Sequence, residues 1–170
     1  WVVNLNASGA NFSAYDIEYD NFGNVYIQDV TLPVGEPPAI TLGHITIRKY
    51  NPTGVFLWSF ILDISICYGD FAVNHVNGDV YLVGDFWTSS SINFAICKLN
   101  STGLLVNSNQ TQGFGYNELW RVKYDHCNNQ LIIGSGSTTY PIRGAYINSS
   151  LSSLNTVNMI GVSDPLIDVS

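Results

Sequence analysis

The chain has 170 residues, of which 46% are apolar and 13% aromatic, enough for one domain with a packed core. Only 11% of residues are charged and the net charge is −7, which excludes a nucleic-acid partner because phosphate binding needs a basic surface. No apolar run approaches the roughly 20 residues that cross a bilayer, so we expect no membrane span.

Three segments share a pattern that is typical of a β-hairpin, at residues 15–29, 70–84 and 119–134. Each has an alternating strand, a polar turn rich in Asn and Gly, and an apolar strand. The sequence therefore predicts strand pairs, with no helix longer than two turns between Ser13 and Asn148. The predicted pairs are 13–20 with 24–30, 70–75 with 79–84, and 118–125 with 130–134.

A second hairpin follows each of the first ones, at 45–58 and 94–107 and in degenerate form at 145–155. Its turn glycines Gly54 and Gly103 lie 49 residues apart. Four strands repeating every 40 to 50 residues or so are typical of a propeller blade. The main alternative is a β-sandwich, in which hairpins do not recur as a set. We therefore predict an all-β, propeller-like fold of about three four-stranded antiparallel blades.

This repeat resembles the SBBP/NHL-type β-propeller repeats. Their blades resemble Asp-x-x-Gly-Asn-Val-Tyr-Val-x-Gly, then a strand ending in Lys-Tyr-Asn-x-x-Gly, then a strand that carries Trp. Residues 20–27 and 48–58 match this pattern best, 78–84 and 98–103 keep much of it, and the third unit lacks the turn glycine and the tryptophan. The resemblance implies a binding or structural module and transfers no catalytic residue.

The blades are expected at approximately 12–60, 70–110 and 118–158, with partial strands at 1–6 and 165–170. Propellers contain about four to eight blades. The chain is therefore expected to be a segment of a larger propeller or repeat protein.

Asparagine occurs 18 times, and five of these residues stand in Asn-x-Ser/Thr sequons. Such sequons are acceptors for N-glycosylation in secreted proteins. The alternative is that a polar turn composition creates them incidentally. We expect glycans on the outer rim of the blades, chiefly at the third-to-fourth-strand turns of the second and third blades. The candidate glycosylation sites are Asn6, Asn11, Asn100, Asn109 and Asn148.

Three cysteines, Cys67, Cys97 and Cys127, are an odd number and form neither a disulfide-dense framework nor a zinc pattern. Cys97 lies within a predicted third strand, whereas the other two fall near a crossing between blades and in a turn. We therefore predict that Cys97 does not bridge to either of them.

No catalytic or cofactor motif stands out. His44, His75 and His126 are scattered, and His126 neighbours Cys127 within one turn, whereas a nucleophilic Cys/His pair converges from separate elements. The glycine-rich segment 134–139 lacks the lysine of a phosphate loop.

Asp70, Asp79 and Asp85 lack calcium-loop spacing and are read as strand-end and turn residues. The four Trp, ten Tyr and eight Phe residues fit a blade core better than a sugar-binding surface. We expect no catalytic residue, no cofactor and no metal site.

These observations favour a non-enzymatic extracellular structural or adhesive glycoprotein module, for example in a cell-surface layer or a filamentous appendage. Its expected partners are covalent N-glycans and proteins, either further copies of itself or other extracellular proteins. The alternative is a carbohydrate-binding or carbohydrate-active propeller whose site lies on residues outside this chain.

Overall fold

The computed structural model describes residues 11–32, 43–87, 92–112, 118–136 and 143–158, and these residues form an all-β structure without a helix. Among them, therefore, no helix is long and apolar enough to cross a membrane. The strands are β1 (Asn11–Tyr19), β2 (Val25–Leu32), β3 (Gly43–Tyr50), β4 (Phe56–Val73), β5 (Val80–Trp87), β6 (Ile92–Leu99), β7 (Leu105–Gln112), β8 (Glu118–Asp125), β9 (Gln130–Gly136), β10 (Arg143–Asn148) and β11 (Leu154–Asn158).

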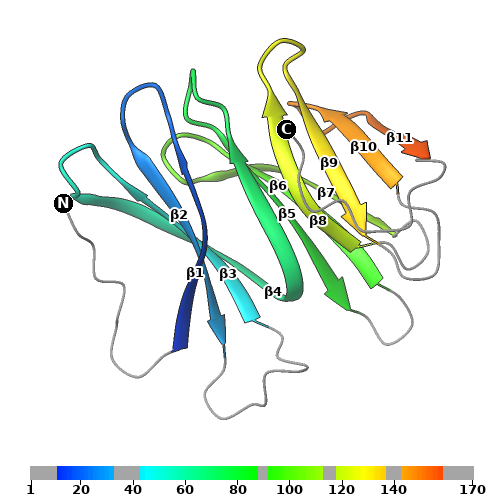
Figure 1. Cartoon of the computed structure of the whole chain (residues 1–170), viewed down its shortest axis with the longest axis horizontal. Coiled ribbons are helices and arrows are strands. Elements are labelled where there is room, and N and C mark those ends of the chain that lie inside the picture. Colours follow the sequence, from blue (N-terminus) through cyan, green and yellow to red (C-terminus); the bar gives the residue numbers. More distant parts are fainter. Residues whose placement is uncertain (1–10, 33–42, 88–91, 113–117, 137–142, 159–170) are drawn as a thin grey trace.

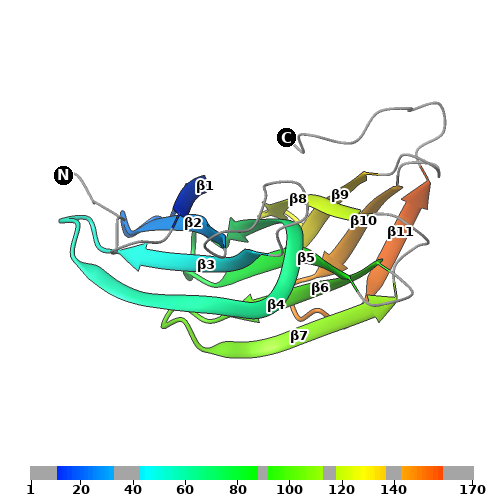
Figure 2. The same cartoon turned by 90° about the horizontal axis from the view of Figure 1, so that it is seen from below.

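Within the two sheets, each strand is hydrogen-bonded to strands next to it in the sequence, and each such pair is antiparallel. One sheet runs in the order β1 to β7 and the other from β8 to β11 (Figure 1). Strand β4 is 18 residues long and bends: its first part pairs with β3 as far as Ile66, and its last part pairs with β5 from Ile66 onward (Figure 2). A register shift between Ile66 and Gly69 accompanies the change of partner.

The bend divides the strands into three four-stranded units. Unit 1 contains β1, β2, β3 and the first part of β4; unit 2 contains the last part of β4, β5, β6 and β7; unit 3 contains β8 to β11. The first strands of the units lie beside one another, because β4 packs against both β1 and β8. Asp70, in the last part of β4, accepts a hydrogen bond from Val122 on β8.

The predicted strand pairs are confirmed by β1 with β2, by β4 with β5 and by β8 with β9. Residues 61–69, expected to separate two blades, are instead part of strand β4. The partial strands expected at 1–6 and 165–170 lie outside the described residues. Cys97 is buried and free, which confirms the prediction that it forms no bridge, and Cys127 is exposed and free.

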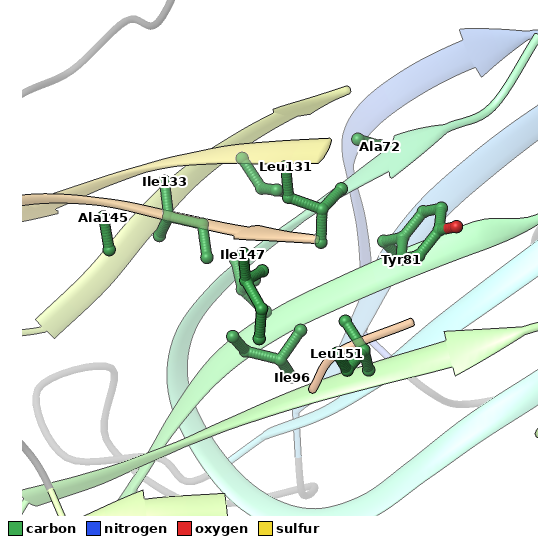
Figure 3. Close-up of a cluster of buried hydrophobic side chains, with 10 residues drawn as sticks. Ala72, Tyr81, Ile96, Leu131, Ile133, Ala145, Ile147 and Leu151 are labelled. Carbon is green, nitrogen blue, oxygen red and sulfur yellow. The ribbon is translucent and has the colours of Figure 1, made fainter. Parts of the chain in front are cut away.

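Two apolar cores fill the spaces between units, because alternate residues of each strand face opposite sides. The core between units 1 and 2 contains Tyr26, Ile45, Ile47, Leu62, Phe71, Val73, Val80, Leu82, Cys97 and Leu99. The core between units 2 and 3 contains Ala72, Tyr81, Val83, Ile96, Val122, Leu131, Ile133, Ala145, Ile147 and Leu151, of which Figure 3 labels eight.

Candidate functional site

Each of the six hairpin turns among the described residues begins with an Asn or Asp whose Oδ1 accepts a hydrogen bond from the residue two positions on. In five of them the donor is a backbone N–H, and in the sixth it is the Ser150 hydroxyl. Short polar side chains of this kind close a turn by taking the place of a backbone carbonyl. The six residues are Asp20, Asn51, Asn74, Asn100, Asp125 and Asn148.

The sequon residues Asn100 and Asn148 occupy the same third-to-fourth-strand turn of units 2 and 3, as predicted. Oδ1 of Asn100 accepts hydrogen bonds from the amide and hydroxyl of Thr102, at 3.0 and 2.7 Å. Asn51 makes the same two bonds to Thr53, at 3.0 and 2.8 Å, although Pro52 blocks glycosylation there. Turn formation therefore accounts for the Asn-x-Ser/Thr spacing at this position without a glycan.

The Nδ2 atoms, which would carry a glycan, differ among these sites. Within the described part of the chain, no hydrogen bond involves Nδ2 of Asn100. Nδ2 of Asn148 donates to the hydroxyl of Ser152 at 2.9 Å. Nδ2 of Asn109, on β7, donates to the carbonyl oxygen of Leu151 in unit 3 at 3.1 Å. A sugar on Asn109 would therefore have to fit between two units.

The remaining two sequon residues lie near the start of the chain. Asn6 falls outside the described residues. Asn11 was expected on or just after a fourth strand, but it is the first residue of β1, the first strand of unit 1. The expectation was wrong because alignment of the turns placed the strand start two residues too late. Strand β1 extends two pairings further, with Phe12 opposite Thr31 and Asn11 opposite Leu32 on β2.

A cluster of charged side chains joins the first strands of the three units. Glu18 on β1 accepts a hydrogen bond from Nζ of Lys123 on β8 at 3.3 Å. Its other carboxylate oxygen lies 3.5 Å from Nε2 of His75, in the turn after β4. One carboxylate of unit 1 thus contacts both other units.

A row of rings extends from this cluster across the neighbouring turns. Tyr19 stacks on His75 with ring centroids 5.2 Å apart, and His75 lies 4.8 Å from His126 by the same measure. His126 in turn lies 4.9 Å from Tyr124. No sequence motif marks this row of rings, because the two histidines are 51 positions apart. Their matching place in the repeat, two residues after Val73 and Tyr124, was the available signal.

Asp70, in the last part of β4, is a buried carboxylate close to unit 3. Its carboxylate accepts a hydrogen bond from the backbone amide of Val122 at 2.9 Å, which ties unit 2 to unit 3. Burial raises the pKa of Asp70 to about 6, and the negative charge of Asp16 adds to this rise, while Val122 N–H and Arg121 oppose it. The carboxyl group is therefore held where its charge is unfavourable at neutral pH.

This position of Asp70 predicts that stability falls as pH rises between about 4 and 6. The folded chain keeps a proton on Asp70 in this range, whereas the unfolded chain, at its ordinary value of 3.8, has released it. Asp70→Asn keeps an acceptor for Val122 and removes the charge. We expect urea denaturation to show the variant gaining stability relative to the original chain, by about 1 to 3 kcal/mol, as pH increases through this range. Parallel pH curves for the two proteins would contradict the assignment.

The other residues considered for chemistry are placed as follows. Within the described part of the chain, no group of three or more His, Cys, Asp or Glu side chains could hold a metal ion. Asp79 pairs with Lys98 at 2.9 Å beside β5, a contact within unit 2. Burial raises the pKa of the Cys97 thiol, which makes its reactive thiolate scarce.

Three further features that the sequence analysis considered for chemistry lie wholly or partly outside the side chains and residues that the structure describes. His44 and Asp85 lie on β3 and β5, but their side chains are not among those described. Of the segment 134–139, Gly134 to Gly136 end strand β9 and the rest lies outside the described residues.

Comparison with known proteins finds no family model that matches the chain and no curated protein that is similar to it.

Proposed function

We propose that the chain is a segment of a β-propeller and that each four-stranded unit is one blade. The support is the sequential antiparallel order within each unit, the adjacent first strands and the apolar cores between units. Blades in propellers are arranged in this way around a central axis. Since closed propellers contain about four to eight blades, closing the ring would require at least one more.

We further propose that the segment serves as a non-enzymatic structural or adhesive module of an extracellular glycoprotein, in a cell-surface layer or a filamentous appendage. The observation that carries the structural role is the set of polar contacts between units. Glu18 contacts Lys123 and His75, and Asp70 accepts the amide of Val122, so these polar groups hold blades together. The low charge and the Asn-rich composition support an extracellular surface.

Site-specific glycan mapping tests the extracellular part of this proposal. We expect mass spectrometry of the native protein to find a glycan on Asn100, whose Nδ2 is free of hydrogen bonds within the described part of the chain. Asn109 should be bare, because its Nδ2 is bonded to the carbonyl of Leu151 between two units. Bare asparagine at all five sequons would overturn the glycoprotein proposal. A glycan on Asn109 together with a bare Asn100 would overturn the expectation that Asn100 is the more accessible of these two sites.

A further inference from the structure

The repeat allows each surface of one unit to be compared with the same surface of its neighbours. The first-hairpin register pairs Tyr19 with Val25 in unit 1, Val73 with Val80 in unit 2, and Tyr124 with Leu131 in unit 3. Residues that lie the same number of positions from these pairs therefore hold equivalent places in the three units. A position that is buried in two units and exposed in the third marks a surface without its usual neighbour.

Unit 1 has such a surface on the face of its sheet opposite to Tyr26, the residue that packs in the core with unit 2. Ile17 is equivalent to Phe71 and Val122, which are fully buried, yet 65% of Ile17 is exposed. Tyr19 is equivalent to Val73, which is 1% exposed, and to Tyr124, which is half-buried, yet 62% of Tyr19 is exposed although its ring stacks on His75. We call this surface, defined by Ile17 and Tyr19, the leading face.

Unit 3 has the complementary surface on the side that faces away from unit 2. Ile132 is equivalent to Tyr26 and Tyr81, which are fully buried against the next unit, yet 37% of Ile132 is exposed. Tyr146, which pairs with Ile132 across the strands, is also exposed. Its equivalent in unit 1, Lys49, is buried, and its equivalent in unit 2, Lys98, is half-buried. We call this surface, defined by Ile132 and Tyr146, the trailing face.

The two interfaces inside the chain show how such faces meet. The hydroxyl of Tyr26 donates to the carbonyl of Gly78 in unit 2, and the hydroxyl of Tyr81 donates to the carbonyl of Ser149 in unit 3, both at 3.3 Å. In both interfaces the trailing face of one unit covers the leading face of the next. The pairing therefore has a fixed direction along the chain.

Hydrogen bonds from the fourth strand of each unit also run to the next unit along the chain. Nε1 of Trp58 donates to the carbonyl of Ser101 in unit 2 at 3.1 Å, and Nδ2 of Asn107 donates to the carbonyl of Ser150 in unit 3 at 2.6 Å. Asn155 holds the equivalent place on β11, opposite Tyr146, and its side chain is exposed.

From this continuity with the internal interfaces we propose that a second copy of the chain docks head to tail, its trailing face covering the leading face of the first copy. Ile132 and Tyr146 of one copy then pack over Ile17 and Tyr19 of the other. Asn155 is placed to donate to the carbonyl of Thr53, the position equivalent to Ser150. This inference rests on the proposed structural role and deepens it, since it names the partner as another copy.

Such a contact is heterologous, because it joins two different surfaces. Repetition of a heterologous contact produces a closed ring if the rotation between copies closes, and an open filament if it does not. Both outcomes leave the apolar faces buried along the assembly.

The test is sedimentation velocity of the whole 170-residue chain over a range of concentrations. We expect the original chain to self-associate, and Ile17→Asp and Ile132→Asp each to weaken self-association by about 10- to 100-fold, because each places a charge in a buried apolar contact. Val106→Asp is the matched control. Val106 is exposed on β7 and its equivalent in unit 1, Leu57, is exposed too, so this change should leave association unaltered.

A mixture of the two charged variants gives the sharpest result. Ile17→Asp retains an intact trailing face and Ile132→Asp retains an intact leading face, so an equal mixture should form a dimer that grows no further. Circular dichroism would confirm that each variant is folded. A monomeric original chain, unchanged association of either variant, or a mixture that stays monomeric would overturn the proposal. The propeller and glycan proposals would survive those results, since glycan mapping tests them separately.

Discussion

Gly103→Ala should lower the free energy of unfolding by about 2 to 5 kcal/mol, because a methyl group there meets two obstacles at once. Gly103 has φ +84°, a conformation that side-chain-bearing residues rarely adopt. An added Cβ would also lie 2.7 Å from Cδ2 of Trp58, which packs over this turn from unit 1. The indole is held there by its hydrogen bond to Ser101, so it cannot simply move away. Chemical denaturation followed by circular dichroism measures the loss.

Gly54→Ala separates the two obstacles. Gly54 occupies the same turn position in unit 1 with φ +83°, so it shares the backbone cost, and the described residues contain no unit before unit 1 that would place a tryptophan over it. We expect a loss of about 1 to 2 kcal/mol for this variant. In a chain that already carries Trp58→Ala, the effect of Gly103→Ala should fall to the same value. An undiminished effect would show that the indole does not restrict the turn.

Much of the fold was predictable because the same hairpin pattern recurs three times in the sequence. Each first hairpin has alternating residues and a turn that begins with Asp or Asn, and all three pairs form where the pattern placed them. The continuous strand β4 was not predicted, because one strand serves two units. The segment 61–68 contains no Gly, Pro or Asn to make a turn, and that was the signal that the chain continues as a strand.

The contacts between units were harder to foresee than the units themselves. Glu18, Lys123 and His75 come from three repeats, and no spacing within one repeat places them together. Only the equivalence of positions between repeats, combined with the packing of β4 against β1 and β8, brings them into one cluster. For the sequons, by contrast, a sequence pattern was visible but had two explanations. The Asn-x-Ser/Thr spacing that signals glycosylation also forms a turn.

Substitution of Leu151 is the other change that we expect to lower the free energy of unfolding strongly. It stands where units 1 and 2 have Gly54 and Gly103, and it keeps the positive φ of those glycines at +60°. It remains buried in the core between units 2 and 3, so packing offsets the backbone strain. Leu151→Ala should therefore cost about 2 to 4 kcal/mol through the lost side chain. Leu151→Gly should cost about 0.5 to 1 kcal/mol less than Leu151→Ala, because glycine relieves the strain that alanine retains.

Leu131 provides the matched site for this comparison. It is fully buried in the same core but lies on strand β9, and it is not among the residues with positive φ. There the order should reverse, and Leu131→Gly should be about 0.5 to 1 kcal/mol less stable than Leu131→Ala. Urea denaturation of the four variants measures both differences under identical conditions. If alanine is the more stable replacement at both positions, Leu151 does not store backbone strain, and its packing alone explains why leucine occupies a glycine position.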